Sequence, residues 1–367
     1  MATSTTRIAR TILALILTLI IFHASVIETT LKSLTKGVGN DEDHDAPFIT
    51  LSERPPSHDA MKPLPLAELV RSESATYTKC PPESAPILDR ISPDENDGKR
   101  RIPRIIHITS KNRCATIEVL RNLRMWRFPG HSLYFHDDDA VERLTSHPLS
   151  QRMFPLLNET LRCVTNGATK SDLWRYLVLY TYGGIYTDID NSPRKFNGNT
   201  IFPTDDSFFV IEQLGIMAQY FIASSPGHPL MRLSLETAMD SLRSIPNVMK
   251  NNPARTTGPN ALKVGFVKFM NGTTDGYISA GTYVGIDGRS ATVVGDKSTS
   301  KDYIVRTGLG DAQKFKYYKA MGIEHFHETN RLPQTGRISC MEHLKMTNGT
   351  NRIANYTFNG SHYVDLG

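Results

Sequence analysis

The sequence has little of what marks the specialised classes of protein. Its four cysteines in 367 residues are too few for a disulfide scaffold. Its 42 basic and 37 acidic side chains leave a net charge of only +5, too small over this length to indicate a nucleic-acid-binding protein. No unit of about 20 to 50 residues repeats, which argues against solenoids and propellers. Hydrophobic residues still make up 39% of the chain, as in an ordinary folded domain.

The amino-terminal region contains a long apolar run, residues 11–27, without Asp, Glu, Lys or Arg. A helix of this length spans about 26 Å, close to the thickness of the thinner membranes of the secretory pathway. A cleaved signal peptide is the alternative, but cleavage after Ala24 or Ser25 would lack a small residue at the third-last position. We therefore expect an uncleaved signal anchor in the Golgi or ER membrane. Residues 1–10 would be cytosolic and the rest lumenal, in a single-pass type II protein.

The segment after this run changes in composition. Nine of the 21 prolines fall within residues 41–100, which contain only two aromatic side chains. Such a segment can bury little apolar surface. We therefore expect residues 28–100 to form a solvated stem, residues 101–345 the folded domain, and residues 346–367 a polar carboxyl-terminal tail.

Glycosylation sequons and cysteines give weak further support for a lumenal domain. Five Asn-x-Ser/Thr sequons begin at Asn158, Asn271, Asn348, Asn355 and Asn359. In an oxidising lumen, Cys80, Cys114, Cys163 and Cys340 are expected to form disulfides. The sequence does not choose among the three connectivities. Our working hypothesis is the nested one, which joins 114 to 163 and 80 to 340.

Residues 170–190, KSDLWRYLVLYTYGGIYTDID, join a helical pattern to a strand-like one. Apolar side chains recur at i, i+3, i+4 and i+7 from Leu173, after Ser171 as the expected helix N-cap. Gly183 is expected to end the helix in the left-handed αL conformation, and Gly184 to allow a sharp turn. The segment therefore predicts a helix, a glycine turn and a strand.

Two acids close this segment. Residues 185–190 alternate in the manner of a strand, so Asp188 and Asp190 are predicted to point to the same side. Paired carboxylates suit Mg²⁺ or Mn²⁺, and such an ion keeps positions that phosphate oxygens can fill. Asp137 and Asp139 form a second Asp-x-Asp, but without the helix, turn and strand, so a solvated turn is the better interpretation there.

Three further side chains are candidates for the same site. Asp172 and Arg175 lie three residues apart on one helix face. A surface ion pair, worth at most about 1 kcal/mol, is the simple interpretation. The functional one has Asp172 binding a ribose or sugar hydroxyl and Arg175 near the diphosphate or donor sugar. His325, beside His327 in IEHFHET, is a candidate third metal ligand, with an ordinary surface or core histidine as the competing interpretation.

The stretch SDLWRYLVLYTYGGIYTDID resembles the signature of the Asp-x-Asp glycosyltransferases of family 32, and is similar to the fungal initiating α-1,6-mannosyltransferases. Four other blocks resemble the family in the same order. They are RIPRIIHITSK (101–111), HSLYFHDDDAVERL (131–144), SSPGHPLM (224–231) and TTGPNAL (256–262). The resemblance covers about residues 101–270.

This resemblance implies a GT-A fold, an α/β architecture that binds nucleotide sugars, and transfer that retains the anomeric configuration. By position it implies that Asp188 and Asp190 bind the metal and act in catalysis together with Arg175. It also implies that the donor is lined by Thr109, Ser110, Asp172, Arg175 and Tyr186. The family usually has Gln and Trp where this chain has Ile108 and Ser110, and Asn where it has Gln219.

We therefore predict a metal-dependent retaining glycosyltransferase that uses Mn²⁺ or Mg²⁺. It would move a hexose, in the first place mannose from GDP-mannose, to a glycan or glycolipid acceptor in the secretory pathway. A galactosyltransferase using a UDP-hexose and an inositol-phosphoceramide mannosyltransferase are alternatives within the class. A metal-dependent phosphohydrolase and a non-catalytic lumenal glycoprotein are alternatives outside it. No nucleic-acid partner is expected.

Overall fold

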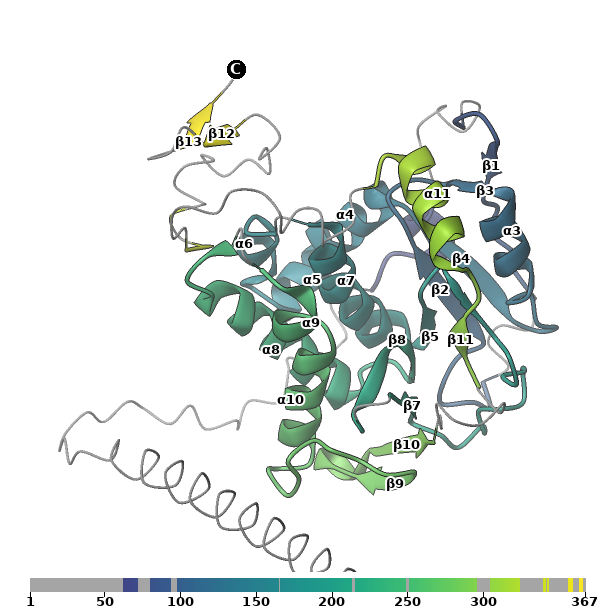
Figure 1. Cartoon of the computed structure of the whole chain (residues 1–367). Coiled ribbons are helices and arrows are strands. Elements are labelled where there is room, and N and C mark those ends of the chain that lie inside the picture. Colours follow the sequence, from purple (N-terminus) through teal and green to yellow (C-terminus); the bar gives the residue numbers. More distant parts are fainter. Residues whose placement is uncertain are drawn as a thin grey trace, which may run out of the picture. The chain divides into compact units, whose positions relative to one another are not determined.

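The computed structural model describes residues 62–71, 80–93, 98–164, 166–212, 215–248, 251–295, 304–323, 339–340, 342, 356–358 and 363–365 (Figure 1). The expected signal anchor at residues 11–27 lies outside these ranges, as do His325 and His327. In the part of the chain that the structure describes, no helix has the length and apolar character needed to span a membrane.

A seven-stranded sheet forms the centre of the domain, in the order β4-β2-β5-β8-β7-β10-β9. In that order the strands are Ser132–His136, Ile105–Thr109, Gly184–Thr187, Met217–Ser224, Ser207–Ile211, Ser290–Val294 and Gly281–Val284. β2 runs parallel to β4 and β5, and β10 runs parallel to β7, whereas β8 and β9 are antiparallel to their neighbours. Five strands therefore point one way and two the other. The predicted mixed α/β architecture is confirmed.

Helices cover both faces of this sheet. On one face lie α4 (Asp138–Ser146), α6 (Leu157–Leu161), α7 (Gly167–Tyr182), α8 (Pro229–Ser244) and α10 (Pro259–Phe269). On the other lie α3 (Ile117–Arg124) and α11 (Asp311–Met321), and Figure 1 shows the two groups on opposite sides of the strands. Alternate strand residues enter the two cores, as Ile185 and Tyr186 of β5 do. Shorter elements are α5 (Pro148–Met153), α9 (Pro253–Thr256), a 3₁₀ turn (Ile286–Gly288) and the antiparallel pair β12 (Tyr356–Phe358) and β13 (Tyr363–Asp365).

Helix α7 begins earlier than its hydrophobic pattern predicts. Its N-cap is Asn166, whose side-chain oxygen accepts the backbone N–H of Thr169 at 2.8 Å. Ser171 therefore lies inside the helix, and its prediction as the cap is wrong. The reason is that Asn166 is an equally good capping residue and already satisfies one of the free N–H groups of the first turn.

The two glycines after α7 bring its end close to the sheet. Gly183 has a positive φ of 67°, but its ψ of −162° differs from the expected αL conformation. Gly184 also has a positive φ, 98°. A Cβ on Gly183 would lie 2.6 Å from Pro226 Cδ, and one on Gly184 would lie 2.7 Å from the carbonyl oxygen of Ile105. Glycine is required at both positions by the positive φ and by a close neighbour, Pro226 for Gly183 and β2 for Gly184.

Two segments of the expected stem belong to the folded unit. They carry α2 (Leu66–Leu69) and β1 (Ser84–Pro86), and β1 pairs antiparallel with β3 (Cys114–Thr116). Leu69 is 0% exposed and belongs to the core on the α7 side of the sheet. Ile87 is 2% exposed and belongs to the core on the α3 side. Composition alone does not account for these segments, because a few well-spaced apolar side chains are enough to dock a proline-rich chain on an existing core.

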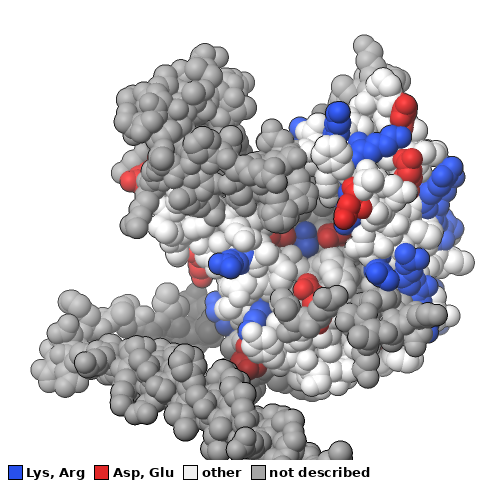
Figure 2. Space-filling view, viewed as in Figure 1, with Lys and Arg blue, Asp and Glu red and all other residues white. Residues whose placement is uncertain are grey.

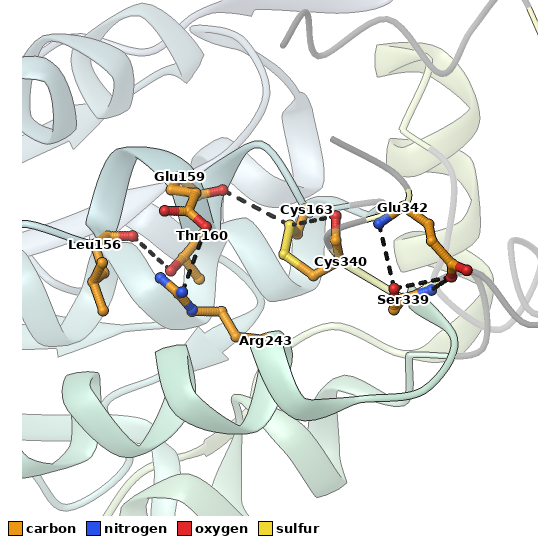
Figure 3. The surroundings of a disulfide bond; sticks show 8 residues. All are labelled: Leu156, Glu159, Thr160, Cys163, Arg243, Ser339, Cys340 and Glu342. Atoms are coloured by element: carbon orange, nitrogen blue, oxygen red, sulfur yellow. Dashed lines mark hydrogen bonds and ion pairs between the residues drawn. A yellow bond between two sulfur atoms is a disulfide. The ribbon is translucent and has the colours of Figure 1, made fainter. Parts of the chain in front are cut away.

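The disulfides join Cys80 to Cys114 and Cys163 to Cys340, with Cα–Cα distances of 5.6 and 5.3 Å. The nested hypothesis is therefore wrong. Pairing of β1 with β3 places Cys114 opposite Pro86, and a turn between Cys80 and β1, in which the backbone N–H of Ser84 donates to the Pro81 carbonyl, accompanies the approach of Cys80 to Cys114. Figure 3 shows the second bond, which ties the chain after α6 to Cys340.

Candidate functional site

The two acids of the Asp-x-Asp motif lie where the central strand β5 ends. β5 stops at Thr187, so Asp188 and Asp190 lie in the turn that leads to β6 (Asn191–Ser192). The backbone N–H of Asn191 donates to the Asp188 carbonyl at 3.1 Å and closes this turn. The expectation of a strand up to residue 190 is therefore wrong, and the turn brings the two carboxylates together. Figure 2 shows acidic and basic side chains side by side in a recess near the middle of the face that it draws.

Asp188 is held from the side of α7. The Tyr186 hydroxyl donates to Asp188 Oδ1 at 2.5 Å, and a guanidinium nitrogen of Arg175 lies 3.6 Å from the same oxygen. The guanidinium carbon of Arg175 also lies 4.4 Å from the centre of the Tyr186 ring. The Asp188 side chain is 34% exposed, so it is oriented by buried neighbours and still accessible from outside.

Asp190 is held from the other face of the sheet. Lys314 of α11 forms an ion pair with Asp190 Oδ2. The backbone N–H groups of Gly308 and Leu309 donate to the Asp190 carbonyl at 2.6 and 3.3 Å. Just before them, β11 (Arg306–Thr307) pairs antiparallel with β6. The motif turn is therefore clamped by a segment more than a hundred residues further along the chain.

Asp172 and Arg175 form a buried ion pair, not a surface one. Their charged atoms lie 3.2 Å apart, and their side chains are 5% and 8% exposed. Asp172 also accepts hydrogen bonds from the Thr257 hydroxyl at 2.8 Å and the Gln219 amide at 3.1 Å. Arg175 donates to the Gln219 carbonyl at 3.1 Å. This network fixes Arg175 beside Asp188, so Asp172 acts on the motif through Arg175.

Burial perturbs the charges of this cluster. It raises the pKa of Asp172 to about 6, against the opposing effects of Arg175 and the Thr257 hydrogen bond. It also raises the pKa of Asp188, where Arg175 opposes the shift and the charge of Asp190 adds to it. Negative charge in this site is therefore costly until a cation balances it.

One acid of the cluster carries no sequence motif. Glu212 follows β7, and burial raises the pKa of its carboxyl, with a further contribution from the charge of Asp188. Its carboxylate also accepts the backbone N–H of Gln219. Among the residues that the structure describes, four carboxylates thus share the region with two cations, Arg175 and Lys314. Only the alternation of β7 towards its end could have pointed to Glu212, and that signal is too general to single it out.

The residues present fit a hard divalent cation. The four acids and two cations leave a surplus of two negative charges, which a divalent ion would balance. Asp188 and Asp190 offer carboxylate oxygens, the ligands that Mg²⁺ and Mn²⁺ prefer. Among the residues that the structure describes, no group of three or more His, Cys, Asp or Glu side chains is arranged to hold a metal. Among the described residues the two motif acids are therefore the candidate ligands, and His325 stays a prediction.

The remaining donor-site candidates lie at the end of the neighbouring strand β2. The Thr109 hydroxyl donates to the His136 carbonyl at 2.8 Å. The Ser110 hydroxyl shares a hydrogen bond of 2.6 Å with the Tyr317 hydroxyl of α11. Both hydroxyls are thus engaged in hydrogen bonds within the protein, and their predicted role in lining the donor stays a prediction. Tyr186, by contrast, contacts Asp188 and Arg175 directly.

The second Asp-x-Asp has a structural role. Asp137 is the N-cap of α4, and its carboxylate accepts the backbone N–H of Ala140 at 2.9 Å. Asp139 lies in the first turn of the same helix, where a negative charge is favourable. The expected solvated turn is therefore a helix start, and it brings no second pair of acids to the site.

Comparison with known proteins agrees with this geometry. Residues 117–208 match the family model described as "Glycosyltransferase sugar-binding region containing DXD motif". The initiation-specific alpha-1,6-mannosyltransferase of Schizosaccharomyces pombe is 30% identical over 151 residues, which cover 35% of this chain and 38% of that protein. This chain therefore matches well under half the length of that relative.

A solved structure, the PaToxG glycosyltransferase, is 19% identical with a TM-score of 0.33, over 46% of this chain and 70% of its own. The matched family range contains α7, β5 and both motif acids. The resemblance stated from the sequence is confirmed by the family model and by the S. pombe relative: residues 117–208 are similar to the sugar-binding region of DXD-containing glycosyltransferases.

Proposed function

We propose that this chain is a metal-dependent, retaining glycosyltransferase with a GT-A fold, which transfers a hexose from a nucleotide sugar to a glycan or glycolipid. One observation carries the proposal. The turn after β5 brings Asp188 and Asp190 together beside Arg175, within the residues that match the sugar-binding region. Paired acids at the end of a central strand, oriented by a buried arginine, suit the binding of a metal and a diphosphate.

The chain's own residues act mainly by orientation and charge. Asp188 and Asp190 would hold Mn²⁺ or Mg²⁺, which when bound supplies positive charge against the leaving diphosphate. Tyr186 and Arg175 fix the Asp188 carboxylate, so little reorganisation is needed when the donor binds. Asp172 in turn holds Arg175. Because this arrangement stabilises a leaving group by charge, departure of the diphosphate needs no proton transfer.

Mannose carried by GDP is the first choice of donor. The choice of mannose is supported by the S. pombe relative, which is named as a mannosyltransferase. A UDP-hexose is the second choice. A glycan or a glycolipid such as an inositol-phosphoceramide is the proposed acceptor. We also propose a lumenal domain anchored in the Golgi or ER membrane by residues 11–27. Two disulfides suit an oxidising compartment, and they support this location.

The test is a donor panel with the purified full-length chain, in the presence of Mn²⁺ and then of a chelator. GDP-mannose, UDP-galactose and UDP-glucose are offered with simple sugar and glycolipid acceptors, and NMR assigns the anomeric configuration of the product. The expected result is metal-dependent transfer from one donor with retention. A chain that hydrolyses simple phosphate esters with Mn²⁺, but turns over no nucleotide sugar, would establish the phosphohydrolase alternative instead.

A further inference from the structure

A lysine far from the Asp-x-Asp motif in the sequence forms an ion pair with one of the motif acids. Lys314, on α11, forms an ion pair with Oδ2 of Asp190. The Lys314 side chain is 25% exposed and that of Asp190 is 15% exposed, so the pair is largely sheltered. The carboxylate proposed to bind the metal therefore already carries a positive partner.

The position of this lysine is built into the fold. The Tyr317 hydroxyl of α11 is hydrogen-bonded to Ser110 at the end of β2. Lys111 donates to the carbonyl of Gly322 at the other end of the helix, at 2.7 Å. Tyr318 is close enough to the acids that, besides burial, their charges raise its pKa. These contacts fix α11 over the site, so Lys314 reaches Asp190 from a fixed base.

An ammonium group and a divalent cation compete for the same carboxylate. Their like charges repel strongly in a partly buried site, where the effective dielectric is low. A metal ion bound by Asp190 would therefore displace the Lys314 ammonium. The four-carbon stem of lysine is flexible, so the ammonium can move while the helix stays in place. A diphosphate bound by that metal would then offer the displaced ammonium a new negative partner.

We propose that Lys314 is an internal counter-ion that exchanges between Asp190 and the donor diphosphate. In the free protein it neutralises Asp190 and opposes binding of the metal alone. When metal and nucleotide arrive together, it moves to the diphosphate and stabilises the negative charge that develops there on transfer. This inference rests on the proposed function, and it predicts that metal and nucleotide each strengthen the binding of the other.

Binding measurements that need no turnover test the exchange. Mn²⁺ affinity is measured by the EPR signal of free Mn²⁺, without nucleotide, for wild type, Lys314→Gln and Lys314→Arg. GDP and UDP affinities are then measured by calorimetry at saturating Mn²⁺. Lys316→Gln is the matched control, because Lys316 lies on the same helix and pairs instead with Glu83 and Glu118.

Lys314→Gln is expected to bind Mn²⁺ alone roughly fivefold more tightly than wild type, and to bind the nucleotide roughly tenfold more weakly with Mn²⁺ present. Lys314→Arg keeps the charge and is expected to stay within about twofold of wild type for Mn²⁺. Lys316→Gln should match wild type in both measurements. Lys314→Met provides a second neutral side chain, and the melting temperatures of all five proteins show whether each variant folds.

Unchanged or weaker Mn²⁺ binding in folded Lys314→Gln or Lys314→Met would overturn the exchange. A nucleotide affinity that does not fall in these variants would overturn it equally. These outcomes are separate from the failure of the proposed function. A wild-type protein that transfers sugar, while the Lys314 variants bind Mn²⁺ as it does, refutes the exchange alone. A protein that shows the exchange with GDP or UDP, but transfers no sugar, refutes the proposed activity alone.

Discussion

Replacing Asp188 by Asn separates the demands of catalysis from those of folding. The amide keeps the size of the side chain and an oxygen that can accept the Tyr186 hydroxyl, but it loses the charge that would hold the metal. We expect transfer to fall by at least about a thousandfold, which corresponds to roughly 4 kcal/mol of activation free energy. Asp190→Asn should cause a loss of the same order, because the two acids are proposed to share one ion.

The stability of Asp188→Asn should behave differently. Burial and the charge of Asp190 raise the pKa of Asp188, so its negative charge is unfavourable in the free protein. The variant loses the attraction of Arg175 at 3.6 Å, but Arg175 keeps its closer partner Asp172 at 3.2 Å. Since Asp188 is about one-third exposed, either effect is worth about 1 kcal/mol or less. The melting temperature should therefore stay within about 4 °C of wild type or rise.

The assay combines initial rates of transfer, with Mn²⁺ and with a chelator, and thermal unfolding followed by fluorescence. Near wild-type transfer by Asp188→Asn in the presence of a chelator would refute the metal mechanism. A fall in melting temperature of more than about 8 °C would refute the electrostatic argument, because the lost activity would then reflect a damaged fold.

Three other predictions concern the surroundings of the site. Asp137→Ala should lower the free energy of unfolding by about 1 kcal/mol through loss of the α4 cap, with transfer unchanged; a loss of transfer like that of Asp188→Asn would mean that the wrong motif was chosen. The pKa of Asp172 is raised to about 6 in the folded protein, so its contribution to stability should be present below about pH 4 and be lost as the pH rises through 6. The free energy of urea unfolding, compared between wild type and Asp172→Asn, should show this loss as the pH rises across that range. A difference between the two proteins that does not vary with pH would contradict the prediction. Mass spectrometry of non-reduced digests should link Cys163 to Cys340, and replacing both by Ser should cost about 2 to 5 kcal/mol; a linked peptide containing Cys114 and Cys163 would contradict the fold.

The local sequence pattern predicted those parts of the site that are formed by residues close together in the sequence. The helix, the two glycines and the strand deliver Asp188 to the end of β5, because periodicity and glycine conformation are properties of short segments. The spacing of Asp172 and Arg175 predicted that they share a helix face. It could not show that the pair is buried, because burial depends on Gln219 and Thr257 from other elements.

Long-range contacts created the rest, and no local signal marks them. The β5 strand stops before the acids because Asn191 closes a turn there, although the alternation of residues continues. Lys314 has no motif around it, and it reaches Asp190 through long-range contacts: β11 pairs with β6 just before α11, and Tyr317 of α11 is hydrogen-bonded to Ser110. Leu69 is buried in the core, although the composition of its segment predicted a solvent-exposed stem.

The distance along the chain between Asp190 and its clamp has a consequence for synthesis. Translation adds roughly 5 to 20 residues per second, so the 124 residues from Asp190 to Lys314 take on the order of ten seconds to make. For nearly all of that interval the motif exists without Lys314 and without the Gly308 and Leu309 amides that hold its turn. A nascent chain therefore contains the whole Asp-x-Asp motif before the residues that complete the site have been made. Truncation anywhere before α11 should leave a protein unable to bind the donor.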